Sequence, residues 1–159
     1  MIEVLKLLEE NGRLSAREIA ETLSCTEAEV AAAIAKYEAD GTILKYAALI
    51  DHEKIDAESV TAMIELKISP HHGEGYDRIA QRIYQYDEVE SLYLMTGAYD
   101  LLVTMNAKTM KDAAQFVYDH LATIEGVTGT ATRFVMKAYK VKNCLVAKRS
   151  EQEERISFL

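Results

Sequence analysis

The chain has 159 residues, enough for one domain or for two small domains joined by a linker, and enough to bury a core without disulfides or metals. It is 49% hydrophobic and 28% charged, its two cysteines are far apart, and it has neither a signal-peptide pattern nor an apolar run that could span a membrane, so we expect a cytoplasmic protein. The formal net charge of −8 argues against non-specific binding of nucleic acid by the whole molecule.

The first 43 residues predict a helix-turn-helix with a supporting helix in front of it. Apolar residues at helical spacing form the first helix, which should end at the turn Asn11-Gly12. Residues 15–18 (SARE) and 26–29 (TEAE) are two capping boxes, in which a hydroxyl and a glutamate three positions later satisfy backbone amides at a helix start. A short helix, a brief turn and a longer helix are typical of DNA-binding domains, so we assign residues 1–43 to one.

The third of these helices should lie in a DNA groove, yet its charge is unfavourable for that role. Val30, Ile34 and Tyr37 repeat at helical spacing, and Gly41 should end the helix. The stretch TEAEVAAAIAKYEADG, residues 26–41, holds four acidic residues and a single lysine. Protein–DNA affinity depends on phosphates neutralised by Lys and Arg, so we expect weak and salt-sensitive binding.

The whole N-terminal part is acidic as well, since residues 1–51 hold ten acidic and five basic residues. Two effects can offset this deficit. Amides at the helix start and nearby hydroxyls can donate to phosphates, and an oligomer presents several binding heads at once. The candidate DNA-contacting residues carry a cationic or hydroxyl donor near the third helix: Arg13, Arg17, Ser24, Thr26, Lys36 and Lys45.

The second half of the chain predicts an α+β domain. Residues 44–59 are extended in character and should form a strand that serves as wing and hinge. Residues 60–141 then alternate strand and helix as β-α-β-β-α-β, the ferredoxin-like plait. The expected elements are a strand at 60–68, a helix at 74–86, strands at 89–96 and 99–107 joined by a tight turn at Gly97-Ala98, a helix at 109–124 and a strand at 129–141. Residues 142–159 should add a short strand over 143–148 and a charged tail.

The strands carry apolar residues on both faces of the expected sheet. One face should be buried under the helices: Ile64, Leu66, Leu92, Leu94, Leu101, Val103, Phe134 and Met136. The opposite face still carries Met63, Tyr93, Met95, Leu102, Val135 and Tyr139. Because a half-solvated sheet should alternate apolar with polar residues, this second face needs a cover. We expect the cover to be a second copy of the sheet in a two-fold dimer; the alternative is the chain's own tail.

Five stretches carry a resemblance to a known family: LLEENGRLSAREIAETL, DGTILKYAALID, VESLYLMTGAYDLLVTM, LATIEGV and TRFVMKAYK. In these stretches and in the order of its elements, the chain resembles the Lrp/AsnC (feast/famine) family of bacterial and archaeal regulators. The resemblance implies a transcription regulator whose N-terminal domain binds operator DNA and whose C-terminal domain senses a small molecule, typically an amino acid. It also implies a dimer formed through the plait, and larger rings, often octamers.

The resemblance further implies an effector site between dimers, near the G-x-Y-D hairpin. The corresponding residues are Thr96, Gly97, Ala98, Tyr99 and Asp100, to which we add the nearby strand residues Thr130 and Thr132. A glycine lets a ligand approach the backbone, turn amides suit a carboxylate, and Asp100 could accept from an ammonium group. Many members have Asp or Asn where this chain has Ala98, so the effector is not identified. Without the resemblance, Gly97-Ala98 would simply close a hairpin that Asp100 caps.

Other functions are weighed against this one. A DNA-silent module that senses an effector while co-assembling with another family member would also explain the acidic third helix. An enzyme resembling siroheme decarboxylases would need a histidine in the hairpin, where this chain has GAYD, so we expect no enzyme. His71-His72 lie in a polar loop without an evident third ligand, and we expect neither a metal nor a cofactor.

Overall fold

The structure is a computed structural model that describes residues 1–55, 58–69 and 75–146. The chain divides into two units, Met1–Ile50 and Asp51–Leu159, and each is described by itself. Among the described residues, none of the helices has the length and apolar content that crossing a membrane requires.

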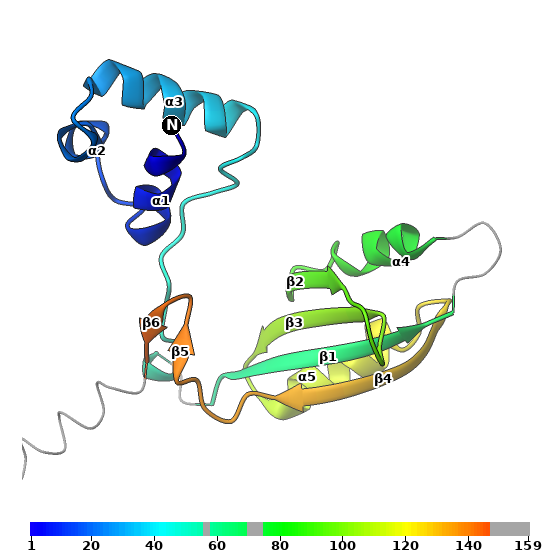
Figure 1. Cartoon of the computed structure of the whole chain (residues 1–159). Helices are drawn as coiled ribbons and strands as arrows, with labels where there is room; N and C mark the ends of the chain where they lie inside the picture. Colours follow the sequence, from blue (N-terminus) through cyan, green and yellow to red (C-terminus); the bar gives the residue numbers. More distant parts are fainter. Residues whose placement is uncertain (56–57, 70–74, 147–159) are drawn as a thin grey trace, which may run out of the picture. The chain divides into compact units, whose positions relative to one another are not determined.

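The first unit is a three-helix domain made of α1 (Ile2–Glu10), α2 (Ala16–Leu23) and α3 (Glu27–Ala39) (Figure 1). Both expected capping boxes are confirmed, at the starts of α2 and α3. Gly41, just beyond α3, has the left-handed φ of +76° that favours glycine at a helix end. The fully buried residues that join the helices include one from each of them: Val4, Ile19 and Val30.

The strand expected within residues 44–59 is absent from the described part of that segment. Its one regular element is the short 3₁₀ helix η1 (His52–Lys54). Leu44, Leu49 and Ile50 are exposed, and the first unit has no described strand with which they could pair. Extended backbone becomes a strand only when a neighbour accepts and donates its hydrogen bonds, which explains the difference.

The second unit contains the expected βαββαβ order (Figure 1). Its strands are β1 (Val60–Ile68), β2 (Val89–Leu94), β3 (Leu101–Ala107) and β4 (Val127–Phe134), which form one antiparallel sheet in the order β2-β3-β1-β4. The helices are α4 (Tyr76–Ile83) and α5 (Met110–Phe116), the second of which continues as a π-helical turn, η2 (Val117–Leu121).

One face of this sheet forms the core together with both helices. Ile64 lies opposite Val103 on β3 and opposite Thr132 on β4, and directly opposite residues point to the same face. Ile64 and Val103 are fully buried in one cluster with Ile79 of α4 and Leu121 of η2. Burying such a side chain contributes roughly 1.5–3 kcal/mol, so this layer dominates the stability of the unit.

Two members of the expected buried face are exposed, which corrects the prediction. Leu94 is 62% exposed and Met136 is 83% exposed. Leu94 is the last residue of the edge strand β2, and Met136 follows the end of β4 at Phe134, so neither lies in the interior of the sheet.

The opposite face carries apolar residues as expected. Met63, Tyr93 and Val135 are exposed and Leu102 is half-buried. The register places Leu102 between Tyr93 on β2 and Glu65 on β1, so these residues share the face that the helices leave open. We call this surface the open face.

The strand that we expected over 129–141 is interrupted after residue 134, whereas the short strand expected over 143–148 is present in part as β6. β4 ends at Phe134, and β5 (Lys140–Val141) pairs with β6 (Cys144–Leu145) in a separate two-stranded sheet. Lys142 and Asn143, which join these strands, both have left-handed φ values, the geometry of a tight two-residue hairpin turn.

Replacing Gly126 with alanine should destabilise the second unit by about 2–3 kcal/mol, because Gly126 has a φ of +92° and an added Cβ would lie 2.8 Å from Cδ1 of the buried Ile79. Chemical denaturation measures the loss. Gly129→Ala is the matched control, since its Cβ would meet only Cβ of Lys67, at an ordinary 3.7 Å. Equal stability of the two variants would contradict this role of Gly126.

Candidate DNA-binding and effector sites

The start of α3, which should approach DNA, is occupied by its own glutamate. The hydroxyl and the amide of Thr26 both donate to Oε2 of Glu29, at 2.7 and 2.9 Å. The amide of Glu29 in turn donates to the Thr26 hydroxyl at 3.3 Å. These bonds, above all the one from the Thr26 backbone, hold the pKa of the Glu29 carboxyl below its ordinary value. A charged carboxylate therefore occupies the N-terminal end of α3, the end that we expected to face DNA.

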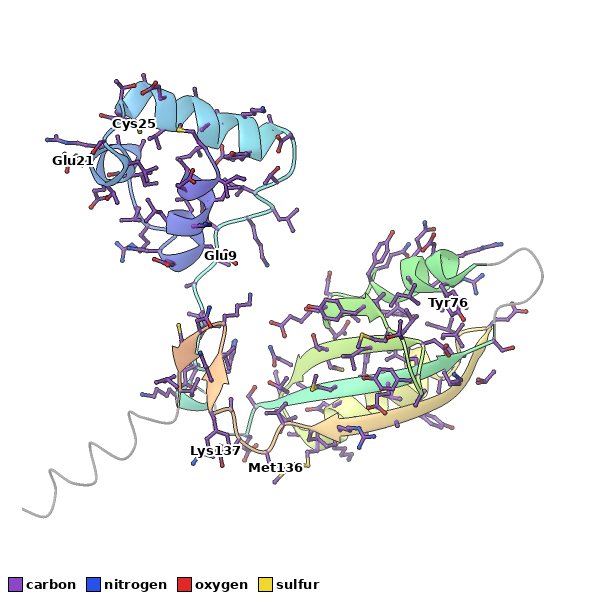
Figure 2. The ribbon with its side chains drawn as sticks, in the orientation of Figure 1. Glu9, Glu21, Cys25, Tyr76, Met136 and Lys137 are labelled. Carbon is purple, nitrogen blue, oxygen red and sulfur yellow. The ribbon has the colours of Figure 1, made fainter. Side chains whose placement is uncertain are left out.

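The start of α2 is built in the same way. The amide and the hydroxyl of Ser15 donate to Oε2 of Glu18 at 2.8 and 2.7 Å, and the same kind of bonds lower the pKa of that carboxyl. One turn further along, Nε of Arg17 donates to Oε1 of Glu21 at 3.0 Å; Glu21 is labelled in Figure 2. An exposed pair of this kind contributes little to stability, but it neutralises one of the few cations of the domain.

The other candidate DNA-contacting residues are exposed. Arg13 follows α1, Lys36 lies in the last turn of α3, and Lys45 lies beyond that helix. Ser24 adopts a left-handed conformation in the turn between α2 and α3. The cations therefore lie around α3, whereas the N-terminal turn of α3 carries two glutamates, Glu27 and Glu29.

The hairpin between β2 and β3 contains the effector residues suggested by the resemblance. The amide of Met95 donates to the carbonyl of Asp100 at 2.8 Å and closes a four-residue loop over 96–99. Gly97 has a φ of +118°, and an added Cβ would have nothing within 4 Å. The tip, Thr96 to Ala98, is exposed. The backbone at Gly97 is thus open to a ligand. The expected hairpin is present, but a four-residue loop replaces the two-residue turn expected at Gly97-Ala98.

Asp100 fixes this hairpin to the central strand. Its Oδ2 accepts from the amide of Ile68 at 2.8 Å and lies 3.3 Å from Nζ of Lys67, while its own amide donates to the carbonyl of Leu66 at 2.9 Å. The bond from Ile68, reinforced by Lys67, lowers the pKa of Asp100. The carboxylate therefore bonds to the neighbouring strand β1 and not to the hairpin turn that the residues alone suggested it would cap. The carboxylate already has a cationic partner, which an incoming ammonium group would have to displace or join.

An ion pair on the open face was missed from the sequence. Nε and Nη2 of Arg133 donate to Oε1 and Oε2 of Glu65 at 2.8 and 3.2 Å, a bidentate arrangement that raises the pKa of Arg133 and lowers that of Glu65. Tyr99 adds a smaller electrostatic contribution to the raised pKa of Arg133. Only the strand register brings Glu65 and Arg133 together. The sequence showed only that each of these strands has a charged residue at a position that points to the open face.

The two threonines that we added to the effector site lie on the other face. Thr130 is opposite Leu66 and Thr132 is opposite Ile64, so both share the face of the buried residues of β1. The expected effector residues therefore fall into two groups, the hairpin tip and the helix-facing side of the edge strand β4. His71 and His72 lie outside the described residues.

Replacing Asp100 with asparagine should lower the stability of the second unit at neutral pH, because the charged carboxylate accepts from Ile68 and pairs with Lys67. The pKa of Asp100 is lowered on folding, so its contribution is complete above the unfolded pKa of about 4 and is lost as pH falls through the lower folded value. Thermal unfolding between pH 7 and pH 2.5 measures this: the gap between the two proteins should close at low pH. A gap that stays constant with pH would contradict the electrostatic origin.

The comparisons with known proteins agree with this architecture. Residues 1–43 match the family described as Winged helix-turn-helix DNA-binding, and residues 61–144 match the Lrp/AsnC ligand binding domain. The chain is 45% identical over 139 residues to the uncharacterized HTH-type transcriptional regulator YugG of Bacillus subtilis, covering 87% of this chain and 84% of that protein. It is 30% identical over 138 residues to the HTH-type transcriptional regulator FL11 of Pyrococcus horikoshii, covering 87% and 88%.

Among solved structures, a transcriptional regulator of Neisseria meningitidis in complex with L-Met matches with a TM-score of 0.73 and 27% identity, over 94% of this chain and 96% of that one. The resemblance drawn from the sequence is therefore confirmed. The chain belongs to the Lrp/AsnC family and is a transcriptional regulator with a helix-turn-helix DNA-binding domain and a ligand-binding domain.

Proposed function

We propose that this regulator acts in the cytoplasm, has no enzymatic activity, and binds an amino acid at the β2–β3 hairpin to change its affinity for operator DNA. The effector would lie between dimers and contact the hairpin loop, residues 96–100. The siroheme-decarboxylase-like alternative gains no support, since that loop contains no histidine.

The observation that carries this proposal is that the backbone of Gly97 is accessible, on a hairpin where the carboxylate of Asp100 lies beside the ammonium group of Lys67. A zwitterion needs amide donors for its carboxylate and an acceptor for its ammonium group. The left-handed Gly97 leaves its backbone accessible, and Asp100 supplies a carboxylate held in place by Ile68. Lys67 is 53% exposed, so its ammonium group can swing away and yield its place to the ligand. The L-Met complex of the Neisseria meningitidis regulator supports an amino acid as the ligand class.

The open face supports a dimer formed through the sheet. It carries exposed apolar side chains, Met63, Tyr93 and Val135, next to the paired charges of Glu65 and Arg133. A second copy of the same face would cover the apolar residues and need not separate the ion pair. Assembly into octamers would then place hairpins of neighbouring dimers on either side of an effector.

The charges of the first unit support weak binding of DNA by each helix-turn-helix. Glu29 occupies the start of α3, and Glu21 neutralises Arg17. The same observation favours a second candidate, a DNA-silent effector-sensing module that co-assembles with another family member. The two candidates differ in one measurable property, which is whether the protein alone shifts its own upstream DNA.

The expected result is that the purified protein binds its own upstream region weakly and at low salt, because few cations contact phosphates; for the same reason the slope of log affinity against log salt should be shallow. One or more amino acids should change this affinity by about 5- to 150-fold, the usual range of allosteric coupling. Fluorescence anisotropy with a labelled duplex, repeated with a panel of amino acids, measures both quantities.

The outcomes separate the candidates. A ligand that raises the melting temperature by several degrees without any DNA binding at low salt would favour the DNA-silent module. Binding and decarboxylation of a tetrapyrrole, with no response to amino acids, would overturn the proposal in favour of an enzyme.

Replacing Glu29 with glutamine should raise DNA affinity about three- to tenfold at low salt, because one negative charge leaves the start of α3 while glutamine keeps the capping box. Helix stability should fall slightly through the lost charge–dipole interaction. Anisotropy and thermal unfolding measure the two effects. Glu9→Gln makes the same charge change on the supporting helix α1 and should alter affinity less than about twofold. Equal gains in both variants would contradict a groove contact at the start of α3.

A further inference from the structure

Positive charge gathers at the C-terminal side of the second unit rather than on the helix-turn-helix. Residues 127–146 hold four basic residues and no acidic one. Arg133 is paired with Glu65, which leaves Lys137, Lys140 and Lys142. All three are exposed, and within the described residues none of them forms an ion pair. We call residues 137–145 the basic hairpin.

The basic hairpin has a defined backbone. Lys140 lies opposite Leu145 and Val141 lies opposite Cys144, and the amide of Val146 donates to the carbonyl of Tyr139 at 3.0 Å. The two residues of the turn, Lys142 and Asn143, place a lysine at the tip of the hairpin. Lys140 and Lys142 therefore lie on a β-ribbon, and Lys137 lies just before it.

Lys142 occupies a turn position whose backbone conformation favours another residue type. Its φ is +41°, in the left-handed region where Asn and Gly are favoured and a side chain such as lysine is strained. The turn would form at least as well with asparagine there. A lysine held at a strained, exposed tip indicates a role for its charge.

Lys137 is oriented by its neighbour. Its Nζ lies 5.2 Å from the centroid of the Tyr139 ring, a cation–π contact on an exposed aromatic residue. Lys137 and the exposed Met136 are labelled in Figure 2 on the segment between β4 and β5. This contact keeps one ammonium group near the ribbon without neutralising its charge.

We propose that the basic hairpin binds the phosphate backbone of duplex DNA and supplies attraction that the acidic helix-turn-helix lacks. Three ammonium groups within residues 137–145, none of them in an ion pair with another described residue, suit a surface that carries one negative charge per about 1.7 Å of helix axis. Contacts of this kind position a protein on DNA without reading sequence. The proposal rests on the proposed function, because it requires that the regulator binds DNA.

The test uses the full chain with the substitutions Lys137→Gln, Lys140→Gln and Lys142→Asn together. Each phosphate contact contributes about −0.9 to the slope of log affinity against log salt, so the slope should become shallower by about two to three. Affinity at low salt should fall about tenfold or more, alike for operator and unrelated duplexes. Lys142→Asn alone should keep or raise the melting temperature while weakening DNA binding. Lys142→Arg keeps the positive charge and should bind DNA as the wild-type protein does.

The matched control makes the same charge change elsewhere in the second unit, with Lys54→Gln, Lys108→Gln and Lys111→Gln. This protein should keep the wild-type salt slope. Equal losses in the two triple variants, or none in the hairpin variant, would overturn the proposal while leaving the proposed function intact. A wild-type protein that binds no DNA at any salt would overturn both. The hairpin variant could instead keep the wild-type salt slope but lose a self-association that the wild-type protein shows without DNA. This result would overturn the proposal and indicate that the basic hairpin binds the acidic first unit of another copy.

Discussion

The central strand β1 is hydrogen-bonded along both of its edges, and this two-sided antiparallel pairing is the constraint on which the second unit depends. It buries Ile64 and Leu66 beneath the helices and turns Met63 and Glu65 to the open face. It also sets the position of the candidate effector loop. The carbonyl of Leu66 and the amide of Ile68 hold Asp100, and Asp100 closes the hairpin through its bond from Met95. Under the proposed function, a ligand at Gly97 would be connected to β1 through the two bonds between Asp100 and that strand.

In the first unit, helix formation and DNA affinity impose opposite demands on the same residues. Glu18 and Glu29 satisfy backbone amides that would otherwise be unpaired, and their charges favour the positive ends of the helix dipoles. Those charges also repel phosphates at the helix that should enter the groove. The three lysines of the basic hairpin offer a resolution, because phosphate contacts act through charge and need not come from the element that reads the bases.

Local features of both sites were predictable, and long-range ones were not. Each capping box spans four residues, so its hydrogen bonds follow from residue type and spacing alone. The bond from Ile68 to Asp100 joins residues 32 apart, and the pair Glu65–Arg133 joins residues 68 apart; both depend on strand register. The same limit explains the missing strand within 44–59 and the early end of β4. Extended character is local, whereas a strand needs a partner. The last printed bond between this segment and β1 runs from the amide of Val135 to the carbonyl of Thr61.

The sequence by itself determined the helix-turn-helix, the order of strands and helices in the plait, the excess of acidic residues around α3 and the family, because periodicity, capping and composition are properties of nearby residues. Only the tertiary structure decided that Asp100 is held by Lys67 and Ile68 and that Thr130 and Thr132 share the helix-covered face. It also decided that the chain after β4 forms a separate two-stranded sheet, whose three nearby lysines make no ion pair with another described residue. These features depend on which strands become neighbours and in what register. Strand neighbours and register are fixed by the burial of one continuous apolar layer, and that layer is assembled from segments far apart in the chain.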